Sequence, residues 1–259
     1  MRAGALTTAV VITVLALAGT LLNRVAAPAW SAAREKQPAL KLDSSVTAAG
    51  QGVTLALLGG FRALVADAAW IRMYARWEAR DLPAVETLIR VVSAIDPRPV
   101  YFWINGARIL AYDLPVWRIE AAGGFEVVAA PAQERIRREQ AQLALRYLDA
   151  AMAFHPASAD LWTERGSIEL NKLRDLAAAA ESFRRAWEQP RAPFYAARLH
   201  AELLRRQGKK SEALAWLVQI HPLQPPDPEG GREDVVLQRI RDLERELRVA
   251  PERAYQPAR

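Results

Sequence analysis

The stretch ADLWTERGSIELNKLRDLAAAAESFRRAWEQP, residues 159–190, decides the fold. Two helical patterns lie on either side of a turn near Asp175, and Pro190 closes the unit. The first pattern pairs a large residue with a small one, Trp162 and Gly166. The second holds a small–large–small triplet whose steps of four and three residues place it on one helix face: Ala179, Phe183 and Ala186. These patterns predict two helices that pack closely as a hairpin, with Trp162 or Phe183 filling the gap beside the next hairpin.

The triplet recurs along the chain, each time with a proline shortly after it. Its copies begin 34 or 35 residues apart, at Ala144, Ala179 and Ala213, and an earlier, degenerate copy begins at Val85. A fixed period of this length predicts stacked helical hairpins that share one continuous core. Residues 44–222 would form this array, and its first helix would end at Gly59-Gly60.

These repeats resemble the tetratricopeptide repeat family. The resemblance implies an all-α fold, a right-handed solenoid of about four helical hairpins. Members of that family bind extended peptides or partner helices in a concave groove, which the first helix of each hairpin lines. The resemblance therefore implies a protein or peptide as the partner of this chain.

When the groove positions of that family are placed on this sequence according to the repeat register, they give ten candidate partner-binding residues. They would make the groove aromatic at one end and basic at the other, which suits an apolar segment followed by acidic residues or a C-terminal carboxylate. A competing interpretation is that the aromatic residues pack against other parts of the chain. The Lys/Asn clamp of some family members is not reproduced here. The ten are Trp70, Tyr74, Trp77, Tyr101, Arg108, Tyr112, Asn171, Tyr195, Arg198 and Arg205.

Three segments depart from the repeat. About 25 extra residues separate the two helices of the second hairpin, and this insert, at about 113–133, is expected to be a loop. Residues 223–231 are rich in proline and glycine and predict a linker. Residues 232–249 carry a one-sided apolar pattern and predict a helix that caps the open end of the array. Residues 250–259 would then form a flexible tail.

The N-terminus carries an uncharged run from Ala3 to Leu22, flanked by Arg2 and Arg24. As a helix it would extend about 30 Å, the thickness of the hydrocarbon core of a bilayer. Residues 1–23 are therefore interpreted as a transmembrane anchor, with a cleaved signal or a buried helix as alternatives, and residues 24–43 as a connector. A single apolar segment after a short basic tail favours an extracytoplasmic body. The basic residues that follow the segment favour a cytoplasmic body instead.

Composition and motifs narrow the class of function. The chain has no cysteine, its three histidines are scattered, and no phosphate loop, zinc-protease or nucleophile motif is present. Its net charge of +6 comes from arginines that alternate with acids at helical spacing, which is typical of a solvated surface and not of a nucleic-acid face. The sequence thus predicts a non-enzymatic scaffold without metal, cofactor, nucleic acid or small-molecule substrate, which would act in assembly of an envelope complex. The alternative is a structural subunit whose groove is filled by its own insert.

Overall fold

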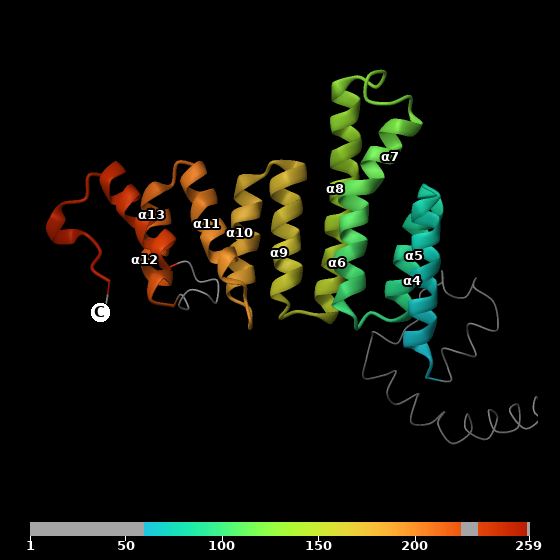
Figure 1. Cartoon of the computed structure of the whole chain (residues 1–259), viewed down its shortest axis with the longest axis horizontal. Coiled ribbons are helices and arrows are strands. Elements are labelled where there is room, and N and C mark those ends of the chain that lie inside the picture. The colour runs from blue at the N-terminus through green and yellow to red at the C-terminus, as the bar shows by residue number, and fades with distance from the viewer. Residues whose placement is uncertain (1–59, 224–232, 258–259) are drawn as a thin grey trace, which may run out of the picture. The chain divides into compact units, whose positions relative to one another are not determined.

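The computed structural model describes residues 60–223 and 233–257. Their regular structure is all helical, as predicted, and no helix among them is long and apolar enough to cross a membrane (Figure 1). The predicted anchor, connector and first helix lie outside the described residues, as does nearly all of the predicted linker. The chain divides into two compact units, one that ends at Pro99 and one that begins at Val100.

The first unit contains the hairpin of α4 (Arg62–Glu78) and α5 (Leu82–Ile95). Asp81 starts α5, because its side chain accepts a hydrogen bond from the backbone N–H of Ala84 at 3.3 Å. The degenerate triplet is buried as predicted, and all three of its side chains (Val85, Ile89 and Val92) are inaccessible to solvent. The Arg62 guanidinium donates two hydrogen bonds to the Ile95 carbonyl, at 2.8 and 2.6 Å, and so joins the start of α4 to the end of α5.

The second unit begins with a hairpin whose two arms are much longer than predicted. Its first arm is α6 (Val100–Arg108), the π-helical turn η2 (Ile109–Asp113) and α7 (Leu114–Ala121), and its second arm is α8 (Ala130–Phe154). The expectation that residues 113–133 form a loop is therefore wrong, since only 122–129 connect the arms. An ion pair of 3.0 Å between Arg118 and Glu139 joins α7 to α8, so the insert extends its own hairpin (Figure 1).

The next helices lie side by side in chain order (Figure 1). One hairpin consists of α9 (Ala159–Ile168), the π-helical turn η3 (Glu169–Leu173) and α10 (Leu176–Trp187). Another consists of α11 (Phe194–Arg206) and α12 (Lys210–Ile220), which the short 3-10 turn η4 (His221–Leu223) follows. Side chains of Ser158 and Asp175 cap the starts of α9 and α10, as expected of these residue types.

Close contact between α9 and α10 depends on Gly166. A Cβ placed on this glycine would lie 3.1 Å from carbons of the Phe183 ring, which is almost fully buried. Trp162, by contrast, is only partly buried, and the guanidinium of Arg185 lies 4.9 Å from its ring centroid. Phe183, and not Trp162, is therefore the large residue that fills this core.

The C-terminal segment contains α13 (Glu233–Glu246) and the 3-10 turn η5 (Pro251–Arg253). Helix α13 packs on α12 with Val236, Ile240 and Leu243, as predicted for a capping helix. The expectation of a flexible tail is wrong for residues 250–257. Tyr255 packs against the α12–α13 core, its hydroxyl lies 3.1 Å from Nδ1 of His221, and its backbone N–H donates to the buried Glu244 carboxylate.

Candidate functional site

The candidate residues of the first unit form an aromatic row on α4. Trp70, Tyr74 and Trp77 make successive edge-to-face contacts, with ring centroids 5.6 and 6.5 Å apart. Trp70 is only 5 % exposed, so the proposed role of this residue in contacting a ligand is wrong. Its burial is expected of a helix that buries one stripe of its side chains, which in α4 also includes Ala66 and Met73. Tyr74 remains exposed and Trp77 is half-buried.

Three other candidates meet between the second and third hairpins. Arg108, Tyr112 and Asn171 line one cavity of about 500 Å³, together with Asp113, Glu164 and Ser167; we call it the α6–α9 cavity. Two π-helical turns, η2 and η3, carry Tyr112 and Asn171 to it. Such turns add a residue to the helical repeat and occur often at functional sites.

Two side chains that line the α6–α9 cavity, Arg108 and Glu164, bind each other. Arg108 donates to the Glu164 carboxylate from Nε and Nη2, at 2.8 and 2.7 Å, and Glu164 is buried. This contact raises the pKa of Arg108, and it commits the guanidinium to a neighbouring helix. Arg108 therefore joins α6 to α9 and is a poorer candidate for holding a ligand than its sequence position suggested.

Tyr112 belongs to the same polar layer. The ammonium of Lys172 lies 3.9 Å from the centroid of its ring, a cation–π contact. Burial raises the pKa of Tyr112, while hydrogen bonding to Asn171 opposes that change. Burial also lowers the pKa of Lys172, and nearby Arg137 acts in the same direction. Glu164 and Lys172 were not among the residues predicted from the sequence.

The last three candidates lie together in a separate hollow between α11 and α13. Tyr195, Arg198 and Arg205 line a pocket of about 350 Å³, which we call the α11–α13 pocket. Helix α13 contributes Arg239, which was not predicted from the sequence because the apolar pattern of this helix indicated only a cap. The remaining lining is one acid, Glu202, and mostly apolar side chains: Leu199, Ala201, Leu217, Val235, Val236 and Leu243.

The charge in the α11–α13 pocket is predominantly positive. Arg205 holds the Glu202 carboxylate through two hydrogen bonds, at 2.8 and 2.7 Å, within the same helix. This pairing lowers the pKa of Glu202 and raises that of Arg205. Burial raises the pKa of Tyr195, so its phenol stays protonated at neutral pH. Because Arg205 is paired with Glu202, the net positive charge of the pocket comes from Arg198 and Arg239, and it favours an anionic group beside the apolar lining.

The tenth candidate, Tyr101, and the buried His200 lie outside both hollows. Tyr101 is exposed on α6, packs edge-on against Phe102, and is not among the lining of either hollow. His200 is buried against Trp216, its Nδ1 lies 2.7 Å from the Ala180 carbonyl, and burial lowers its pKa. Within residues 60–223 and 233–257, no group of three or more His, Asp or Glu side chains is placed to hold a metal ion.

Compared with known proteins, the sequence matches no family model and no curated protein.

Proposed function

We propose that this chain is a membrane-anchored scaffold of the tetratricopeptide-repeat type that binds a peptide or partner protein in the assembly of an envelope complex. The α11–α13 pocket is the observation that carries this proposal. It combines an apolar lining with the guanidinium groups of Arg198, Arg205 and Arg239. Arginine binds carboxylates through paired hydrogen bonds, so this combination suits an apolar residue next to a carboxylate.

The size of the α11–α13 pocket supports a peptide ligand. A volume of about 350 Å³ is at the lower end of the range for ligand pockets. It would hold one or two side chains, and the remaining ligand would extend over the exposed ring of Tyr195. Tyrosine provides a large contact area at low cost in conformational entropy, which is why it is common in protein–protein contacts.

The alternative, a structural subunit whose groove is filled by its own insert, has less support. Helix α7, the main part of the insert, packs against η2 and α8. Neither the α6–α9 cavity nor the α11–α13 pocket has an α7 residue in its lining. The cross-helix pair of Arg108 and Glu164 does favour a structural role for the α6–α9 cavity, and the proposed binding site is therefore confined to the α11–α13 pocket.

Residues 3–22 would anchor the scaffold, with its body on the extracytoplasmic side. This part of the proposal rests on the uncharged run of 20 residues in the sequence. Membrane pelleting of the expressed full chain, followed by N-terminal sequencing of the mature protein, tests it. An anchored protein pellets with its N-terminus intact. Cleavage after the apolar run, near the small residues of Ala27-Pro28-Ala29, would contradict the anchor.

Selection from a peptide library tests the binding site. The library carries randomised residues at a free C-terminus, and the bait is the full chain in mild detergent. We expect enrichment of peptides that end in an apolar residue with its carboxylate or that carry an acid beside it. The variant Arg198→Ala/Arg205→Ala/Arg239→Ala should lose this enrichment, while the neighbouring Arg206→Ala, outside the pocket, should keep it. Equal enrichment by both variants would contradict the assignment.

A further inference from the structure

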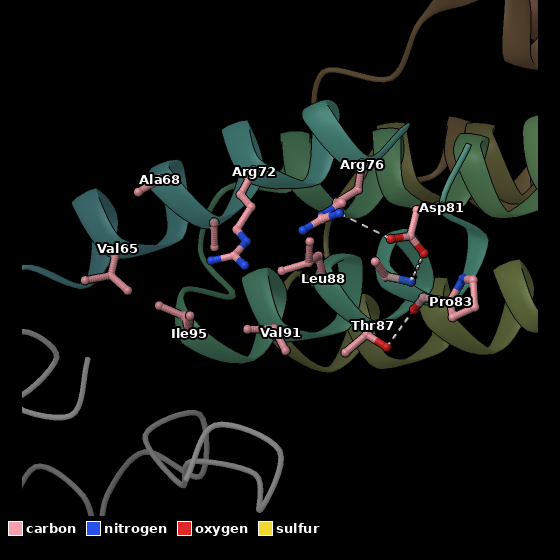
Figure 2. Close-up of a pocket in the computed structure, with 12 residues that line it drawn as sticks. Val65, Ala68, Arg72, Arg76, Asp81, Pro83, Thr87, Leu88, Val91 and Ile95 are labelled. Atoms are coloured by element: carbon pink, nitrogen blue, oxygen red, sulfur yellow. Dashed lines mark hydrogen bonds and ion pairs between the residues drawn. The ribbon is translucent and has the colours of Figure 1, made fainter. Parts of the chain in front are cut away.

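The α4–α5 hairpin of the first unit has an apolar groove along one side. This α4–α5 groove has a volume of about 860 Å³, and its lining from α4 includes Val65, Ala68 and Ala69. Helix α5 contributes Ala84, Leu88 and Val91. Figure 2 shows Val65 on α4 and Leu88 and Val91 on α5 among the lining side chains, with Arg72 and Arg76 extending from α4 toward α5.

The apolar surface continues from the groove over α4. Leu64 and Ile71 are 64 % and 70 % exposed, and with Ala68 they follow the i, i+4, i+7 spacing of one helix face. A contiguous apolar surface of this kind marks a place where another segment packs. Small side chains on both helices, Ala68, Ala69 and Ala84, would let the backbone of a further helix approach closely.

We propose that the occupant of the α4–α5 groove is residues 44–58 of the same chain. The sequence from Ser44 to Phe61 carries no charge, which suits the apolar part of the lining. The sequence predicts a helix for residues 44–58, which would extend about 22 Å, and the α4 side of the groove, from Val65 to Arg76, extends about 17 Å. The occupant is thus long enough to cover the whole groove.

The connection between the two segments permits this arrangement. Gly60 has φ of +85°, a left-handed conformation that glycine adopts readily, immediately before α4. A chain that reverses direction at Gly59-Gly60 would run antiparallel to α4. Residue 58 would then be level with Arg62, and Asp43 with the turn of α4 that carries Arg76. Asp43 would then lie near Arg76, which also forms an ion pair of 3.5 Å with Asp81.

The short connection also distinguishes this occupant from a second copy of the chain. A segment tethered by two residues has an effective concentration in the millimolar range, far above that of a separate molecule in solution. The α4–α5 groove of the first unit is therefore filled by a segment of the same chain.

Disulfide trapping tests the proposal, because the natural chain has no cysteine. The full chain is purified in mild detergent with the pair Val53→Cys/Ala68→Cys or Ala49→Cys/Arg72→Cys. The control pair, Val53→Cys/Arg90→Cys, places its second cysteine on α5 at an exposed residue outside the lining. Mild oxidation followed by mass spectrometry of the digested protein reports which cysteines are joined.

We expect most of the protein to form the intrachain disulfide in both groove pairs and little in the control pair. Ala69→Trp, which fills the groove, should strongly reduce this disulfide while the far-ultraviolet circular dichroism stays unchanged. Disulfides between two chains would overturn the proposal in favour of a second copy as occupant. Equal trapping in the groove and control pairs, or none in any, would overturn it as well.

Discussion

Replacing Gly166 by alanine tests the contact that sets the distance between α9 and α10. Inside an ordinary helix this change stabilises by about 1 kcal/mol. Here the new methyl group would lie 3.1 to 3.2 Å from three carbons of the Phe183 ring, and that ring is enclosed. Forcing an extra methyl group into a packed core costs about 1–3 kcal/mol. The two effects together predict a loss of up to about 2 kcal/mol in the free energy of unfolding.

Urea unfolding followed by circular dichroism measures this loss, and a double-mutant cycle assigns its cause. Phe183→Leu removes the ring atoms that the new methyl group would approach, so Gly166→Ala should be tolerated much better in that background. A coupling energy of about 1–2 kcal/mol is expected, within the range for residues in contact. If Gly166→Ala stabilises the protein by the full helix-propensity gain, with no coupling to Phe183, the close approach described here is refuted.

Three further predictions concern titration and the C-terminal segment. Burial raises the pKa of Glu169, so the stability it contributes is present below its unfolded pKa and lost as pH rises through its folded pKa. Glu169→Gln should therefore gain stability relative to wild type as the pH rises above 4.5, measured by urea unfolding, and a constant difference would contradict this. Hydrogen bonds from Arg184 and Arg185 lower the pKa of Glu181 to about 2. The carboxylate therefore makes a modest, solvent-screened contribution to the stability of the fold, which is present above pH 4.5 and lost as the pH falls through about 2. The stability difference between wild type and Glu181→Gln should shrink over that range, measured by thermal unfolding. Tyr255→Phe removes the hydroxyl that lies beside His221 and should lower the free energy of unfolding by about 1 kcal/mol. Tyr255→Ala should lower it more, because the ring is also removed from the α12–α13 core. Unchanged urea midpoints in both variants would indicate that the tail is loose.

The helices and their core faces could be predicted largely from the sequence. A triplet such as Ala213, Leu217 and Ile220 is local, and its spacing alone determines which face is buried. The structure of the insert could not be predicted in this way, because the repeat length shows how many residues are extra but not which secondary structure they form. Its own apolar pattern would have indicated a helix, since Leu114, Pro115 and Ile119 are buried at helical spacing in α7.

The sequence indicated which of the candidate residues lie together only where they share one helix. Tyr195, Arg198 and Arg205 meet in one pocket because they share a face of α11. The partner of Arg108 was not predicted, since pairing with Glu164 depends on how two helices of different hairpins are packed. Such contacts between distant residues leave no trace in the spacing along one helix.

The most direct test of the central claim combines a change in the peptide with a change in the α11–α13 pocket. A peptide selected by the wild-type chain is made with a free and with an amidated C-terminus, or with its acid replaced by the amide where the acid is internal. Calorimetry measures the affinity of both forms for wild type, for Arg239→Ala and for Arg206→Ala. We predict that amidation weakens binding to wild type and to Arg206→Ala at least tenfold, and that it has a much smaller effect on Arg239→Ala. An equal effect of amidation on all three proteins would contradict recognition of a carboxylate by this pocket.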